Sequence, residues 1–183
     1  PKEGIIEFKN YSVRYRPETN IALKDINFKI LAGEKVGIIG RTGSGKSTLC
    51  LALFRILEPE SGTIFIDGVD ICEIGLRTLR SSLTIIPQDP QLMKGTLRYN
   101  IDPFDSYSDE KIIEIMETLK INYLIENSSG LDFYISETGT NLSIGEKQLI
   151  CIARALLQNS KIVIMDEATA NIDFQTEQTI QIA

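Results

Sequence analysis

Apolar and polar residues alternate along much of the first thirty positions, as they do in strands with one buried face. The pattern occurs over residues 5–9, 11–15 and 26–30. A further strand is expected over residues 63–66, before a turn. The Pro-Glu-Thr-Asn run at 17–20 and the Asp67-Gly68 pair have the composition of turns. We therefore predict an antiparallel β subdomain in the N-terminal part of the chain.

Other segments are apolar on both faces, which is typical of buried parallel strands. They are residues 36–39, 83–86 and 161–166. Helical patterns are expected over residues 46–57 and 76–80. We expect the three apolar segments to lie inside a sheet that is covered on both faces.

The pattern becomes mostly helical from about residue 91 onward. Ser108 precedes a helix that runs to about Leu119 and carries acidic residues in its first turn, where the helix dipole favours them. Further helices are expected at 122–126, 144–158 and 173–182. We predict a helical subdomain over residues 91–158, within a single domain that covers residues 1–183.

The composition of the chain excludes several classes of protein. With 43% hydrophobic and 24% charged residues, the chain is globular and is neither disordered nor a coiled coil. A net charge of −6 argues against a nucleic-acid partner, which needs a basic surface. No histidine is present and the three cysteines are scattered, so we expect no zinc site and no disulfides, as in a reducing, intracellular setting. No apolar run approaches the ~20 residues of a membrane span, and the start at Pro1 suggests a fragment of a longer protein.

The strongest motif is a glycine-rich loop between an apolar strand and a helix, with the form G-x-x-x-x-G-K-S. Its residues, with the next one, are Gly40, Arg41, Thr42, Gly43, Ser44, Gly45, Lys46, Ser47 and Thr48. Glycines let successive backbone N–H groups point at an anion, and the helix N-terminus adds its positive dipole. Lys46 would reach the β- and γ-phosphates of ATP, and Ser47 would bind Mg²⁺. The alternative is a glycine-rich turn without a ligand.

A second candidate lies where the apolar segment 161–166 ends in Asp166-Glu167. In phosphate-loop NTPases a strand beside the loop ends in an Asp that holds Mg²⁺, and Asp166 fits this role. Glu167 would then lie next to the γ-phosphate, where a carboxylate can orient the attacking water. The alternative is a pair of acids that only solvates a strand end.

Five separated motifs occur in the same order as in the nucleotide-binding domain of ATP-binding cassette (ABC) transporters, which the chain therefore resembles. They are the phosphate loop, Gln88 within 85–89, the signature-like residues 141–148, Asp166-Glu167, and residues 170–173. The resemblance covers essentially the whole chain. It implies an α/β fold with a phosphate-loop NTPase (RecA-like) core, the N-terminal antiparallel β subdomain, the helical insertion subdomain and a truncated C-terminal part.

The resemblance also implies roles for single residues. Residues 11–16 look like the aromatic loop that stacks on adenine, and Tyr15 is the preferred ring, with Tyr11 as the alternative. Gln88 resembles the glutamine that contacts Mg²⁺ and the attacking water, although a plain loop residue after proline has the same sequence. Asp173 corresponds to the family's D-loop.

The signature loop departs from the usual Leu-Ser-Gly-Gly-Gln. It reads Leu142, Ser143, Ile144, Gly145 and Glu146. In the family this loop clamps the γ-phosphate that is bound on a second domain. Ser143 and Gly145 retain their donors, whereas Glu146 places a negative charge near that anion, which predicts a weak partner site.

Several short runs are similar to the second nucleotide-binding domain of the C subfamily, the multidrug-resistance-associated proteins. They are residues 15–17, 76–80, 100–104 and 167–170. In that subfamily the second domain's phosphate loop belongs to the competent site, and its signature completes a degenerate one. The family's histidine should follow Glu167 by about thirty residues, but the chain ends sixteen residues after it. We therefore expect this fragment to bind ATP with little turnover.

Taken together, the residues and the resemblance predict an ATPase that drives substrate movement across a membrane by ATP-dependent dimer closure. The expected partners are a second nucleotide-binding domain and the transmembrane domains of the same polypeptide, with this domain at the cytoplasmic face. A soluble ABC ATPase acting on nucleic acid or ribosomes is a rival, which the acidic charge disfavours. A regulatory module, whose ATP gates a channel, is a second rival.

Overall fold

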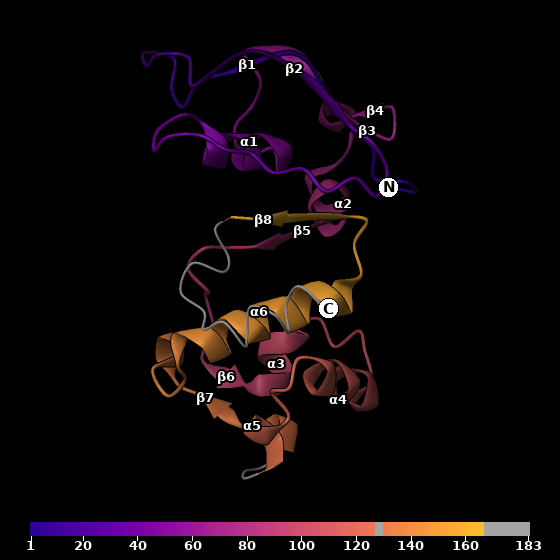
Figure 1. Ribbon diagram of the computed structural model, residues 1–183, viewed down its shortest axis with the longest axis vertical. Helices are drawn as coiled ribbons and strands as arrows, with labels where there is room; N and C mark the ends of the chain where they lie inside the picture. The colour runs from indigo at the N-terminus through magenta and orange to yellow at the C-terminus, as the bar shows by residue number, and fades with distance from the viewer. Residues whose placement is uncertain (127–129, 167–183) are drawn as a thin grey trace. The chain divides into compact units, whose positions relative to one another are not determined.

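The computed structural model describes residues 1–126 and 130–166. The chain divides into two units, Pro1–Thr84 and a second unit that begins at Ile85. Each unit has its own elements in Figure 1, and each is described by itself.

The first unit is built on an antiparallel sheet with the strand order β2-β1-β3-β4. The strands are β1 (Ile6–Val13), β2 (Leu23–Ile30), β3 (Ser61–Ile66) and β4 (Val69–Asp70). The two short strands expected over 5–15 form one strand, because the register shifts after Phe8 and Asn10 takes a positive φ of 48°. This bulge lets β1 bend without ending. The predicted antiparallel β region is confirmed.

Short helical segments and a tight turn complete this unit. The helices are α1 (Lys46–Leu53), η1 (Ile71–Glu73) and α2 (Leu76–Ser81). Asp67 and Gly68 have φ values of 50° and 79°, as a two-residue turn between antiparallel strands requires. The Asp67 carboxylate also accepts the backbone N–H groups of residues 2–5, which ties the start of the chain to this turn.

The expected strand at 36–39 is not found. These residues have no regular secondary structure, and Val36, Ile38 and Ile39 are 47%, 50% and 100% exposed. The four-stranded sheet of the first unit is complete without them. An apolar run becomes a strand only where neighbouring strands accept its backbone hydrogen bonds, and no strand described in this unit does so.

The second unit combines two small sheets with a helical body. Its strands are β5 (Leu83–Ile86, which begins at the boundary), β6 (Gly95–Thr96), β7 (Tyr134–Ile135) and β8 (Ile162–Met165). Its helical segments are α3 (Leu97–Ile101), α4 (Asp109–Thr118), α5 (Tyr123–Glu126), η2 (Gly130–Asp132), η3 (Glu137–Gly139) and α6 (Ile144–Gln158). Strand β5 pairs with β8, and β6 pairs with β7.

Helix α6 is the centre of this unit, with α3 and α4 beside it in Figure 1. Every residue from Gln148 to Ala155 except Arg154 is buried. The apolar side chains of α3 and α4 complete one continuous core with it. Helices α3 to α6 lie within residues 97–158. The helix expected at 173–182 lies outside the described residues.

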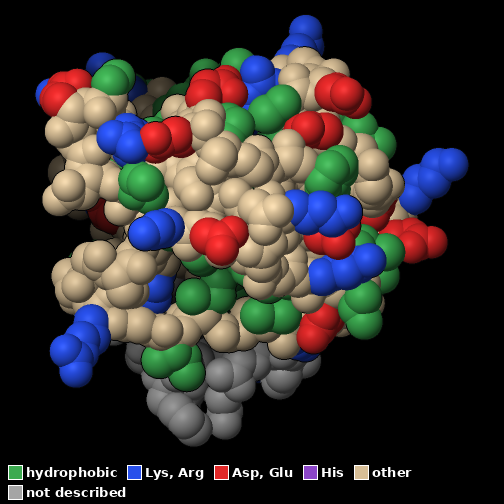
Figure 2. Space-filling view, turned by 90° about the horizontal axis from the view of Figure 1, so that it is seen from above, with side chains coloured by type: hydrophobic (Ala, Val, Ile, Leu, Met, Phe, Trp, Pro, Cys, Tyr) green, Lys and Arg blue, Asp and Glu red, His purple; other side chains and the backbone are tan. Residues whose placement is uncertain are grey.

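The surface carries both signs of charge. Figure 2 shows Lys and Arg side chains interspersed with Asp and Glu on the face in view, without a wide basic field over the described residues of that face. Of the described helices, none combines the length and the apolar character that crossing a membrane demands.

Candidate nucleotide site

The phosphate loop leads directly into α1, and two of its glycines have backbones that other residues rarely adopt. Gly43 has a φ of 79° and Gly45, the residue before α1, a φ of 99°. The Ser44 N–H donates to the Arg41 carbonyl at 3.1 Å, which closes the loop. A Cβ on Gly45 would lie 2.7 Å from Leu23 Cδ2. The sequence folds this way because glycine tolerates the positive φ at both positions, and a Cβ on Gly45 would also require the Leu23 methyl group to shift.

Lys46 is the first residue of α1 and folds back over the loop. Its Nζ donates to the carbonyl oxygens of Gly40 and Arg41, at 2.8 and 3.3 Å. Both contacts are exposed, so the ammonium group can exchange them for phosphate oxygens at small cost. A positive charge therefore lies where the first N–H groups of α1 have no helical partner, and this is an arrangement that suits an anion.

The two glycines predict a graded mutational effect on ATP affinity. Gly43→Ala meets no atom within 4 Å, so only the positive φ costs energy, about 1 kcal/mol. Gly45→Ala adds the contact with Leu23. We expect a loss of Mg–ATP affinity of at least about tenfold for Gly45→Ala and below about fivefold for Gly43→Ala. Isothermal titration measures both; Gly75→Ala, with an ordinary φ and open space, is the matched control.

The two candidate adenine-stacking rings have opposite environments. Tyr15 follows β1 with its side chain 52% exposed, and its hydroxyl is 2.9 Å from Thr48 Oγ1 on α1. Tyr11 is 1% exposed and packs edge-on against Phe8. Burial, the largest cause, and nearby Cys72 and Glu58 raise the pKa of Tyr11 to about 12. Tyr15 is thus the ring that is both accessible and tied to the phosphate-loop helix, and it stays our predicted adenine contact.

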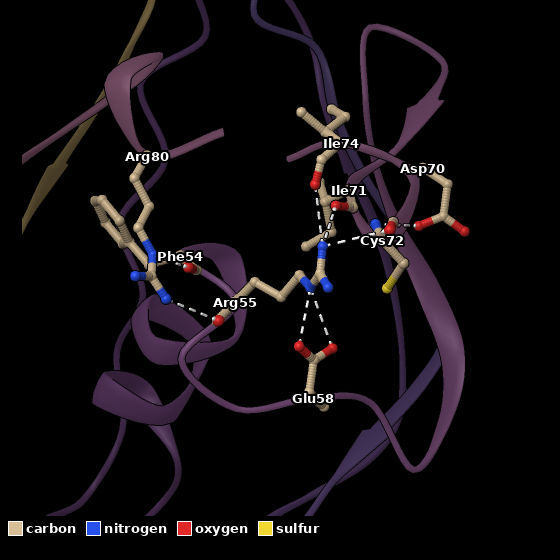
Figure 3. Close-up of polar contacts among 8 residues, drawn as sticks. All are labelled: Phe54, Arg55, Glu58, Asp70, Ile71, Cys72, Ile74 and Arg80. Carbon is tan, nitrogen blue, oxygen red and sulfur yellow. Dashed lines mark hydrogen bonds and ion pairs between the residues drawn. The ribbon is translucent and has the colours of Figure 1, made fainter. Parts of the chain in front are cut away.

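Two arginines hold the opposite end of α1, as Figure 3 shows. Arg80 of α2 donates to the Phe54 and Arg55 carbonyls at 3.1 and 3.2 Å, where a cation is favoured at the end of a helix. Arg55 directs its guanidinium to Glu58 and to three carbonyls of the segment 71–74. Arg55 also has a φ of 48°, so α1 ends at Leu53 and not at the expected residue 57.

In the second unit, Gln88 and Asp166 follow two paired strands. The Asp166 N–H donates to the Ile86 carbonyl at 3.1 Å, where β8 and β5 end side by side. Gln88 lies two residues beyond Ile86 and is exposed. The structure therefore brings together the strand ends that carry these two predicted Mg²⁺ contacts. Glu167 and Asp173 lie outside the described residues.

The signature loop begins α6 with a capping box. The Ser143 N–H donates to Glu146 Oε2 at 2.7 Å, and the Glu146 N–H donates to Ser143 Oγ at 3.2 Å. Tyr123 of α5 donates its hydroxyl to Glu146 Oε1 at 2.9 Å. Burial works to raise the pKa of the Glu146 carboxyl, but these hydrogen bonds outweigh it and lower the pKa. The ionised carboxylate is thus turned back onto the start of its own helix.

The capping box could have been found from the sequence, because Ser followed three residues later by Glu before an apolar run is its signature. The Tyr123 contact joins residues 23 positions apart and has no local signal. In the signature loop, Ile144 is 56% exposed, and a Cβ added to Gly145 would meet no atom within 4 Å. The loop therefore presents an accessible end, and the ionised Glu146 carboxylate beside it is hydrogen-bonded by Ser143 and Tyr123.

The donor set fits ATP with Mg²⁺ better than a bare metal. No three His, Cys, Asp or Glu side chains gather into a metal cage within residues 1–126 and 130–166. Mg²⁺ is usually held by one or two carboxylates together with phosphate oxygens and water. Within the second unit, Gln88 and Asp166 offer donors of that sparse kind.

The chain is similar to proteins of known family. Residues 23–170 match the family model described as ABC transporter. The chain is 54% identical over 182 residues to ATP-binding cassette sub-family C member 3 of Rattus norvegicus. It is 52% identical over 183 residues to metal resistance protein YCF1 of Saccharomyces cerevisiae. Each match covers 99% of this chain but 12% of the relative, so the chain spans a small part of these proteins.

A solved structure is also similar. It is described as a bacterial Atm1-family ABC exporter with ATP bound, and its likeness to this chain has a TM-score of 0.91 at 36% sequence identity. The match covers 98% of this chain and 32% of that chain.

Proposed function

Since the chain belongs to the ABC transporter family and has the phosphate-loop NTPase fold of its nucleotide-binding domain, we propose that it is the ATP-driven motor domain of a membrane transporter. The observation that carries the proposal is the phosphate loop, whose glycine conformations and folded-back Lys46 suit the triphosphate of ATP. Its similarity to sub-family C proteins supports the transporter assignment.

Each part of the proposed site has one task. Tyr15 stacks on adenine, and the amides of the loop with Lys46 hold the β- and γ-phosphates. Ser47, Gln88 and Asp166 would hold Mg²⁺, which would supply positive charge to neutralise the phosphate oxygens. Glu167 orients a water molecule for in-line attack on the γ-phosphate. These residues supply positioning and charge, which are what phosphoryl transfer chiefly requires.

We propose further that this is the second nucleotide-binding domain of its polypeptide. Its partners would then be the first such domain, whose signature closes over the ATP bound here, and transmembrane domains that receive the motion at the cytoplasmic face. The ionised Glu146 at its own signature supports a weak reciprocal site, because that carboxylate opposes an incoming phosphate. We expect no nucleic-acid partner.

The test is performed on the intact protein in lipid vesicles. Uptake or release of a panel of labelled candidate substrates and ion conductance are recorded with and without Mg–ATP. ATP-dependent flux without conductance supports the motor. Conductance that ATP gates, without flux, favours the regulatory alternative, and neither response with intact ATP binding argues against both.

A further inference from the structure

Two side chains of α6 hold the segment that contains Gln88. Gln148 is 2% exposed and donates its side-chain Nε2 to the Pro87 carbonyl at 3.1 Å. Arg154 donates to the Gln91 carbonyl at 3.1 Å. The two carbonyls flank Gln88 on either side, so one helix binds both ends of this short segment.

The spacing allows the segment to bridge the two attachments. Gln148 and Arg154 are six residues apart, which corresponds to about 9 Å along a helix. The four peptide steps from residue 87 to residue 91 span at most about 14 Å when extended. Gln88 and Asp89 are exposed between the two attachments, and Pro90 is buried. The position of Gln88 is thereby set relative to α6 as well as relative to β5.

Arg154 is an unusual residue for such a contact, because none of the ion pairs among the described residues includes it. Its guanidinium is partly buried, and this burial lowers its pKa. Besides Gln91, it donates from Nε to the Asn100 carbonyl and from a terminal nitrogen to Asn100 Oδ1 at 3.2 Å. When a partly buried cation has only neutral oxygens as hydrogen-bond acceptors, the loss of any one of them costs considerable free energy.

Asn100 extends this network through the following turn. It is fully buried, and its side chain accepts from the Met93 N–H and donates to the Met93 and Thr96 carbonyls, at 2.8, 2.8 and 3.0 Å. Every donor and acceptor of the Asn100 amide is therefore used, which gives the segment 91–100 one arrangement. Arg154 thus attaches α6 to an already rigid turn.

We propose that Gln148 and Arg154 are positioning residues for Gln88, so that the helix that starts at the signature loop also places the side chain that meets Mg²⁺ and the attacking water. The proposal rests on the proposed function for the role of Gln88. It joins the signature loop and Gln88 in one framework, so that a shift of α6 at Ser143 carries Gln88 with it.

The test uses Gln148→Met and Arg154→Lys in the intact protein, with Gln158→Met as the matched control at the exposed end of α6. Met keeps the length of Gln without its donor, and Lys keeps the charge of Arg with a single donor group. We expect kcat for ATP hydrolysis to fall about tenfold and the half-saturating Mg²⁺ concentration to rise, while KM for ATP changes less than about twofold. Gln158→Met should change none of these values.

A purely structural role predicts a different result. Turnover per folded molecule and its Mg²⁺ dependence would then match the parent protein, with only the folded amount reduced, and this outcome overturns the proposal. Gln88→Ala separates the two levels of inference. If Gln88→Ala shifts the Mg²⁺ dependence and the α6 variants do not, only the positioning by α6 is refuted, and the role of Gln88 stands. If Gln88→Ala itself has no effect, the proposed role of Gln88 fails.

Discussion

Replacing Lys46 with Met is expected to weaken Mg–ATP binding at least about 100-fold, because charge-assisted bonds to two phosphates contribute roughly 1.5–3 kcal/mol each. Among the described residues, Lys46 Nζ donates to the carbonyls of Gly40 and Arg41, and both contacts are exposed. Losing them costs the folded chain little, since exposed hydrogen bonds to backbone are easily replaced by water. The variant therefore separates ligand binding from folding.

Titration calorimetry with ATP and AMP measures this effect. AMP lacks the β- and γ-phosphates, so its weak affinity should be the same for both proteins. Thermal unfolding without nucleotide checks the fold, and Lys111→Met, on the exposed face of α4, controls for the loss of one positive charge. An ATP affinity within about threefold of the parent would contradict the assignment of the loop as the triphosphate site.

Local chemistry made much of this site predictable. The bounds of α6 match the predicted helix 144–158, because its apolar periodicity is strong and Ser143 with Glu146 caps its start. Asp67-Gly68 forms the expected turn for a similar reason, since few residues adopt two successive positive φ values. The phosphate loop belongs to the same class of local signals.

Contacts between distant positions were not predictable in this way. The hydroxyl of Tyr15 meets Thr48 across 33 positions, and Arg154 meets Asn100 across 54. Hydrophobicity at 36–39 predicted a strand, but an apolar run does not specify the neighbour that would pair with it. Similarly, the contact that caps the end of α1 joins the carbonyl of Arg55 to Arg80, 25 positions further on.

Glu167→Gln should lower turnover and spare ATP affinity, whereas Lys46→Met should lower ATP affinity. The amide keeps the size of the carboxylate but cannot accept a proton from water, and loss of a general base lowers rates about 10²–10⁴-fold. We therefore expect turnover of the intact protein to fall at least about 100-fold, with Mg–ATP affinity changed less than about threefold. Phosphate release and ATP binding, measured on the same preparation, give the two quantities.

Glu117→Gln, an exposed acid on α4, is the matched control and should leave both quantities unchanged. The result bears on which domain this is, because the second-domain proposal requires the phosphate loop of this chain to belong to the hydrolytic site. Unchanged turnover in Glu167→Gln would remove that proposal together with the role of Glu167. Lost turnover with normal ATP binding by Glu167→Gln, together with lost binding by Lys46→Met, would show that this chain contributes both the affinity and the chemistry of one site.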